Sequence, residues 1–186
     1  MDIAENIAKH YHEILKLIGE DPTREGLVDT PMRAARALID ATCGTHQTAE
    51  SIVNDAIFST TSNGMITISA IPFFSTCEHH LMPFEGHVSI AYLPNGTLLG
   101  LSKIPRIVSM FAHRLQIQEQ LTQQIADEIH RLSNGLGVIV TISAKHSCMR
   151  ARGIKSEGTM TTTVALGQFL EYPLLQSQFW NSVCTN

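Results

Sequence analysis

Residues 65–93 read MITISAIPFFSTCEHHLMPFEGHVSIAYL, and this stretch decides how the chain is expected to fold. Its two ends, residues 65–74 and 86–93, are apolar segments rich in β-branched residues, which is typical of strands. Between them, residues 77–80 place a cysteine, a glutamate and two histidines in consecutive positions. All four of these side chains can bind a metal ion or move a proton. Two predicted strands therefore flank a segment with the side chains of a reactive site.

The rest of the chain adds helices on both sides of these strands and then two more strands. Thr30 is expected to cap the second helix, with Pro31 in its first position. No single alternation of strand and helix suggests a doubly wound sheet, so the predicted class is α+β with antiparallel pairs. In chain order we expect helices at 3–18, 30–41 and 48–58, strands at 65–74 and 86–93, a helix starting at 102, a helix at 119–133, strands at 136–146 and 158–169, and a short helical tail.

Composition and charge exclude several classes of protein. The 186 residues carry a net charge of −4 and no Lys/Arg tract, which argues against non-specific binding to nucleic acid. The apolar runs are too short to span a bilayer, and the first 18 residues have the pattern of a helix rather than of a signal peptide. We therefore expect one cytoplasmic domain. Disulfides are not expected in that setting, and Cys43 and Cys184 have no metal-binding neighbours, so both are interpreted as ordinary cysteines.

The remaining cysteines have neighbours that suggest a metal site. Cys77 and His80 have the Cys-x-x-His spacing of two ligands to one ion, and Cys148 lies in the segment KHSCM directly after a predicted strand. Together they would give three ligands and one open position, the pattern of catalytic zinc. Spacing alone leaves packing roles equally open, and it leaves His79 and His146 as either proton-transfer groups or surface histidines near the metal.

Six motifs carry a resemblance to a known family. In order along the chain they are EDPTREGLVDTPMRAARAL, STCEHHLMPFEG, IAYLP, GLSKIPRIV, FAHRLQIQEQLTQQIA and HSCMRARGI. They resemble GTP cyclohydrolase I, the zinc enzyme that opens folate biosynthesis, over residues 20–169. The resemblance implies a single domain over residues 1–186, with a helical part at 1–55, a catalytic tunnelling-fold part at 56–170 and a tail at 171–186. It also implies that sheets of neighbouring subunits join into a barrel and that two such rings stack as a homodecamer.

The resemblance also implies a role for each site residue. Cys77, His80 and Cys148 would bind one Zn²⁺ per subunit, and His79 and His146 would serve in acid–base catalysis. Glu119 would accept hydrogen bonds from guanine with support from Gln118, and Glu78 is expected only to order its loop. The cations and the hydroxyl expected to hold the triphosphate are Lys103, Arg106, Arg152, Arg33, Arg36 and Ser102, and we count Ser102 and Gln118 among the catalytic residues as well.

The implied reaction converts GTP into 7,8-dihydroneopterin triphosphate and formate. Two alternatives stay open at this point: a related zinc enzyme that makes a partial or different product, and a paralogue of this fold without activity. The paralogue would be expected to lack a ligand or a proton-transfer histidine, and this chain retains them all. Many relatives have a basic–acidic pair where this chain has Ser69 and Ala70, which puts regulation and assembly in doubt more than the chemistry.

Overall fold

The computed structural model describes residues 2–184 and divides the chain into two compact units, Met1–Cys43 and Gly44–Asn186. The N-terminal unit contains α1 (Ile3–Leu17) and α2 (Thr30–Ala41), which pack against each other. Asp2 caps α1 because its carboxylate accepts a hydrogen bond from the Ala4 amide. Ala4 and Ala8 are buried, whereas Ile3 and Ile18, at the two ends of the helix predicted over residues 3–18, remain more than 60% exposed.

The predicted N-cap of α2 is wrong. Asp29 is the capping residue, Thr30 is the first residue of the helix, and Pro31 is the second. The reason is that the preceding residues already turn, since the Val28 amide donates to the Arg24 carbonyl. Asp29 continues that turn in a right-handed conformation, so the helix begins one residue earlier than the sequence pattern suggests.

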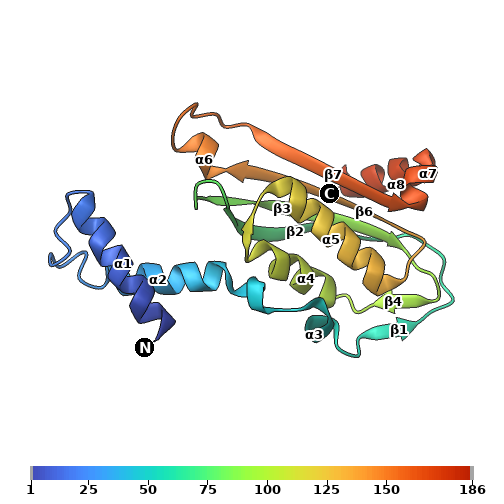
Figure 1. Cartoon of the computed structure of the whole chain (residues 1–186). Coiled ribbons are helices and arrows are strands. Elements are labelled where there is room, and N and C mark those ends of the chain that lie inside the picture. The colour runs from blue at the N-terminus through green and yellow to red at the C-terminus, as the bar shows by residue number, and fades with distance from the viewer. Residues whose placement is uncertain (1, 185–186) are drawn as a thin grey trace. The chain divides into compact units, whose positions relative to one another are not determined.

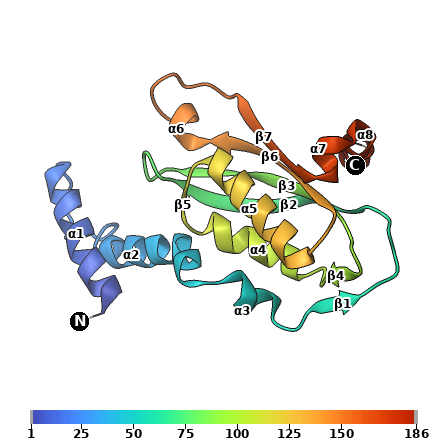
Figure 2. The ribbon, with the colours of Figure 1, turned by 45° about the vertical axis from the view of Figure 1, so that its right-hand side comes forward.

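The C-terminal unit consists of a sheet with helices on it (Figures 1 and 2). The sheet has the strand order β5-β2-β3-β6-β7, in which β2, β3, β6 and β7 pair antiparallel and the short β5 runs parallel to β2. The α+β class with antiparallel pairs is therefore confirmed. The elements are η1 (Cys43–His46), α3 (Ala49–Val53), β1 (Ile57–Ser59), β2 (Ile66–Cys77), β3 (Pro83–Leu93), β4 (Thr97–Leu99), α4 (Lys103–Ala112), β5 (Leu115–Gln116), α5 (Gln118–Ser133), β6 (Gly137–His146), α6 (Ser147–Arg150), β7 (Thr159–Gly167), α7 (Gln168–Glu171) and α8 (Pro173–Cys184).

The strands are apolar on both faces at one end because two sets of helices cover them. In β6, Val138, Val140 and Ile142 pack into the main core, to which α4 and α5 contribute. Ile139 points to the opposite face and packs in a second cluster with Phe169 and Phe179 of the C-terminal helices. Successive side chains point to opposite faces of a strand, so covering both faces buries the first six residues of β6 without interruption.

Two features differ from the sequence-based expectation. The third helix was expected to reach residue 58, but α3 ends at Val53 because Asn54 adopts a left-handed φ of 52°. Residues 57–59 instead form β1, which pairs with β4 in a separate two-stranded sheet. Within residues 2–184, no helix is long and apolar enough to cross a membrane.

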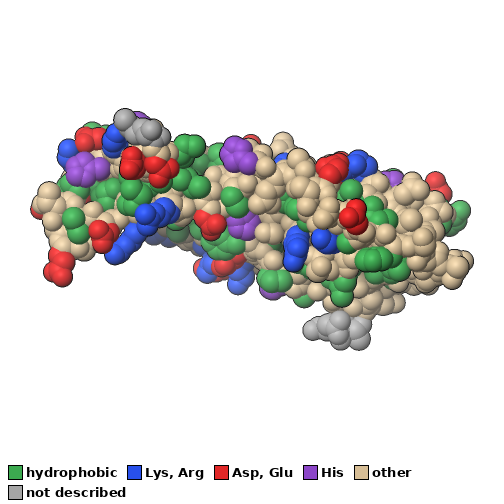
Figure 3. Space-filling model, turned by 90° about the horizontal axis from the view of Figure 1, so that it is seen from below, with side chains coloured by type: hydrophobic (Ala, Val, Ile, Leu, Met, Phe, Trp, Pro, Cys, Tyr) green, Lys and Arg blue, Asp and Glu red, His purple; other side chains and the backbone are tan. Residues whose placement is uncertain are grey.

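Charges on the face drawn in Figure 3 are mixed, with Lys and Arg side chains interspersed among Asp and Glu.

One strained position lies within the sheet. The pairing of β2 and β3 shifts register between Ile68 and Ile71, and Ala70 inside this bulge has φ 55°. The Ala70 side chain is exposed, so its left-handed backbone is not offset by packing of its methyl group.

We predict that Ala70→Gly stabilises the protein. The left-handed conformation costs alanine about 1–2 kcal/mol. Glycine would remove that cost, but it lowers stability by about 0.4–1 kcal/mol because it makes the unfolded chain more flexible. The free energy of unfolding should rise by about 0.5–1 kcal/mol in denaturant titrations. Ala151→Gly, at an exposed residue with φ −84°, is the control and should lower it. Equal losses in both variants would contradict the idea that the bulge is strained.

Candidate metal centre and active site

The site forms at the end of the sheet where β2 and β6 end and β3 begins. Register pairs Ser75 with Phe84 and Phe84 with His146, so residues far apart in sequence lie side by side. β2 ends at Cys77, and the chain passes from β6 directly into α6, which carries Cys148. The pairing of three strands therefore brings the CEHH segment next to the end of β6.

A tight turn after β2 returns His80 toward Cys77. The Leu81 amide donates to the Cys77 carbonyl at 2.9 Å, and the Cys77 amide donates to the Met82 carbonyl at 2.8 Å. Leu81 has a left-handed φ of 53°, which reverses the chain within the turn. These contacts fix the direction of the segment without using any of its reactive side chains.

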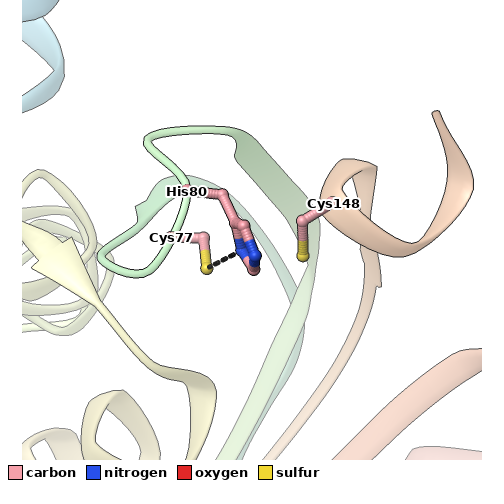
Figure 4. A group of neighbouring side chains, drawn as sticks. All are labelled: Cys77, His80 and Cys148. Carbon is pink, nitrogen blue, oxygen red and sulfur yellow. Dashed lines mark hydrogen bonds between the residues drawn. The ribbon is translucent and has the colours of Figure 1, made fainter. Parts of the chain in front are cut away.

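Cys77, His80 and Cys148 converge from the turn and from α6 (Figure 4). Their ligand atoms all lie within 4.8 Å of one another, and Cys77 Sγ is 3.9 Å from His80 Nδ1. Tetrahedral zinc with its usual bond lengths would separate such atoms by about 3.5–3.8 Å. A small closure of the side chains would therefore place all three on one ion.

The chemistry of the three donors also fits a metal ion. Two thiols and one imidazole form a ligand set that is typical of zinc and not of the hard cations. Burial, followed by the neighbouring Cys77, raises the pKa of the Cys148 thiol. A bound cation would offset both effects by stabilising the thiolate. Ser75, two residues before Cys77 on β2, has a buried hydroxyl without a partner among the described residues, as expected beside a site that an added group completes.

His146 lies next to this centre in a half-buried and ordered position. Its ring stacks on Phe84 with centroids 4.6 Å apart and planes 5° apart. Its Nε2 atom is 2.8 Å from Oε1 of Gln118, whose side chain is fully buried. Burial lowers the pKa of His146, and the charge of Glu119 opposes that effect. The ring is therefore held in one orientation and favours its neutral form.

His79 differs from His146 because it faces solvent. Its side chain is 63% exposed, and Nε2 is 3.8 Å from a carboxylate oxygen of Glu78. The rings of His79 and His80 meet edge to face, with centroids 6.2 Å apart. His79 therefore lies beside His80, one of the three residues that could hold a metal ion, and faces solvent.

The residues expected to bind substrate fall into separate groups. Ser102, Lys103 and Arg106 lie at the start of α4, where the Lys103 ammonium donates to the Ile52 carbonyl at 2.8 Å. Arg152 is exposed just after α6, and Glu119 is exposed in the first turn of α5. Arg33 and Arg36 lie on α2 in the N-terminal unit, where Arg33 pairs with Asp29.

Sequence reasoning missed two partners of His146. Phe84 was read only as part of a motif, although its position at the start of a strand beside CEHH could have suggested contact with the site. Gln118 was expected to support guanine binding, but its side chain contacts His146 and the strands beneath α5. No local pattern signals that contact, because Gln118 and His146 are 28 residues apart.

Comparisons with known proteins agree with the motifs. A family model described as GTP cyclohydrolase I matches residues 7–184. "GTP cyclohydrolase 1 1" of Pseudomonas syringae pv. tomato is 48% identical over 95% of this chain and 95% of its own length. "GTP cyclohydrolase 1" of Pseudoalteromonas translucida is 49% identical over 91% of this chain and 92% of its own. Among solved structures, the apo form of the archaeosine synthase QueF-Like matches with a TM-score of 0.43 and 20% identity, over 55% of this chain and 95% of that one.

We predict that Cys148→Ser lowers the metal content well below one ion per chain. A hydroxyl is a far weaker ligand for zinc than a thiolate, so two ligands would remain. The measurement is elemental analysis after loading with zinc chloride and dialysis. Cys184→Ser is the matched control, since that thiol is exposed at the end of α8, and it should retain the wild-type content. Full occupancy in Cys148→Ser would show that Cys148 only packs.

Proposed function

The chain belongs to the GTP cyclohydrolase I family, and we propose that it converts GTP into 7,8-dihydroneopterin triphosphate and formate at a zinc centre. This reaction would be the first step of tetrahydrofolate and pterin biosynthesis. The protein is thus an enzyme that hydrolyses GTP, and the proposal concerns its metal, its product and its site residues. The observation that carries the proposal is the convergence of Cys77, His80 and Cys148 next to the ordered His146.

Cys77, His80 and Cys148 would hold one Zn²⁺ per subunit. Zinc with three protein ligands lowers the pKa of water in its open position to about 7, which makes a nucleophile available at neutral pH. Cys77 is buried, Cys148 is half-buried and His80 is exposed, so the three ligands would surround an ion that is reached from the solvent side. The exposed side leaves room for a substrate to approach.

His146 and His79 would move the protons of the reaction. Opening the imidazole ring of guanine breaks C–N bonds at C8, and each nitrogen that leaves carbon needs a proton. His146 is held rigidly by Phe84 and Gln118, which suits a group that must reach one atom of the substrate. His79 lies on the solvent side, where it could exchange protons with water.

The base and the triphosphate would be held by separate groups. The Glu119 carboxylate would accept from N1–H and the exocyclic amine of guanine, which adenine cannot match because its N1 is an acceptor. The triphosphate would bind to Ser102, Lys103 and Arg106 at the start of α4 and to Arg152. Arginine suits bidentate contact with phosphate. Arg33 and Arg36 on α2 would add further positive charge.

We further propose a cytoplasmic homodecamer of two pentameric rings. β7 is the last strand of its sheet, and β5 pairs with β2 at Thr76 and Cys77 alone, so both edges are open to pairing among the described residues. Open edges of this kind favour the addition of another strand. Joining the sheets of neighbouring subunits would close them into a barrel and would bring residues of different subunits into one site.

The reaction is tested by following formate release from GTP and the fluorescence of the oxidised product. His146→Ala and His79→Ala should keep bound zinc while slowing turnover by about 10²–10⁴-fold, the usual contribution of a general acid or base. His87→Asn, on an exposed histidine of β3, is the control and should turn over normally. Loss of zinc in His79→Ala but not in His80→Ala would reverse the assignment of ligand and proton-transfer group. A formylated pyrimidine without formate would show that the reaction stops early.

We also predict that Glu119→Ala loses the preference for GTP. Removing a charged acceptor from the base should lower kcat/KM for GTP by about 10–100-fold, which corresponds to hydrogen bonds to an ionised group. Gln120→Ala, its exposed neighbour on α5, is the matched control. The measurement compares GTP with ATP in both variants. Unchanged discrimination in Glu119→Ala would place the purine elsewhere.

A further inference from the structure

We propose that Gln118 is a positioning residue that fixes the tautomer of His146, with Nε2 protonated and Nδ1 left as the atom that exchanges a proton with substrate. The role of Nδ1 in turnover rests on the proposed function. The tautomer itself is a property of the resting protein, so it can be tested whether or not the proposed reaction is correct.

The orientation of the Gln118 amide is set by two backbone carbonyls. The side chain is fully buried at the start of α5, above the pairing of β6 and β7. Its nitrogen lies 3.0 Å from the Ile142 carbonyl oxygen and 3.1 Å from that of Met160. Carbonyl oxygens can only accept, so the NH₂ group must face them and the amide oxygen must point away. The flipped amide would place three acceptors together in a buried site, at a substantial cost.

Two threonines give the same orientation independently. Thr122 donates its hydroxyl proton to the backbone carbonyl oxygen of Gln118 at 2.7 Å, because that oxygen can only accept. The Thr122 and Thr162 hydroxyls are 2.6 Å apart, so Thr162 must be the donor in that pair. A hydroxyl has one proton, and Thr162 therefore accepts from the Gln118 nitrogen at 3.1 Å. All three neighbours of this nitrogen are therefore acceptors, and they share its two protons.

The direction of the last hydrogen bond follows from the others. The Gln118 oxygen carries no proton, and it lies 2.8 Å from Nε2 of His146, so Nε2 must donate. Neutral imidazole has one N–H, which leaves Nδ1 with its lone pair free. Turning the ring over would put the carbon Cε1 in place of Nε2 and would lose the hydrogen bond to Gln118, so this bond and the stacking on Phe84 together hold one ring orientation.

This arrangement makes one side of the ring inert in proton transfer. An amide oxygen is too weak a base to take the Nε2 proton, so a proton can enter or leave His146 at Nδ1 alone. The buried network of Gln118, Thr122 and Thr162 thus fixes the proton on Nε2 and leaves Nδ1 unprotonated and able to accept a proton. Partners that orient a histidine in this way commonly decide its tautomer.

Neutron diffraction on the deuterated full-length protein, loaded with zinc and kept at a pH where His146 is neutral, tests the tautomer directly. We expect a deuteron on Nε2 that points to Gln118 Oε1 and no deuteron on Nδ1. The hydroxyl deuterons should point from Thr162 to Thr122 and from Thr122 to the backbone carbonyl of Gln118. A deuteron on Nδ1 alone, or a Gln118 amide with its nitrogen toward His146, would overturn the proposal. This experiment needs no variant and no turnover.

A pair of variants tests the consequence for catalysis. Gln118→Met keeps the length of the side chain but removes the amide, so kcat should fall by about 10–100-fold, the range for losing a partner that orients a histidine, with KM for GTP and zinc content little changed. The tautomer of His146, followed by isotope-edited vibrational spectra, should become mixed. Thr162→Val is the control, since both carbonyls still orient the amide, and it should keep the wild-type tautomer. An unmixed tautomer in Gln118→Met would overturn the proposal even if turnover fell.

Discussion

The antiparallel register of β2, β3 and β6 is the constraint on which the site depends. It aligns Ser75, Phe84 and His146 in one row, so that β2 and β6 end on the same side of the sheet. A slip of one residue between β3 and β6 would turn every side chain of one strand to the opposite face. His146 would then lose Phe84, and Cys148 would move away from Cys77. The apolar cores on both faces of the sheet oppose such a slip because each strand buries a different set of residues on each face.

The site combines a rigid buried side with an exposed side. His146 is held by stacking and by a hydrogen-bond network in which every polar atom of the Gln118 side chain has a partner. A fully satisfied buried network of this kind orders the groups that it contains. The exposed residues proposed to take part are His79, His80, Glu119, Arg106 and Arg152. In a protein with net charge −4, these arginines are the groups that we propose as local positive charge for a triphosphate.

The sequence predicts the larger elements but not how they are joined. Periodic apolar segments indicated the four long strands and the α+β class, and the family motifs indicated Cys148 as a partner of Cys77 and His80, although 71 residues separate the two cysteines (148 − 77). The end of α3 was missed because the helix was carried on to the apolar residues 57 and 58, although Asn54 is of a type that often adopts the left-handed conformation ending a helix. The contact between Gln118 and His146 was missed because it depends on how α5 packs on β6 and β7, which no local pattern encodes. Positions defined by tertiary packing are the ones that sequence reasoning could not reach.

The central claim is that hydrolysis of GTP occurs at the centre formed by Cys77, His80 and Cys148. It is tested most directly by adding zinc in steps to protein stripped by a chelator, while bound zinc and formate release are measured together. The account predicts that the rate rises in proportion to bound zinc and reaches its maximum at about one ion per chain, the occupancy of a single three-ligand site. Full formate release from protein without metal would contradict it.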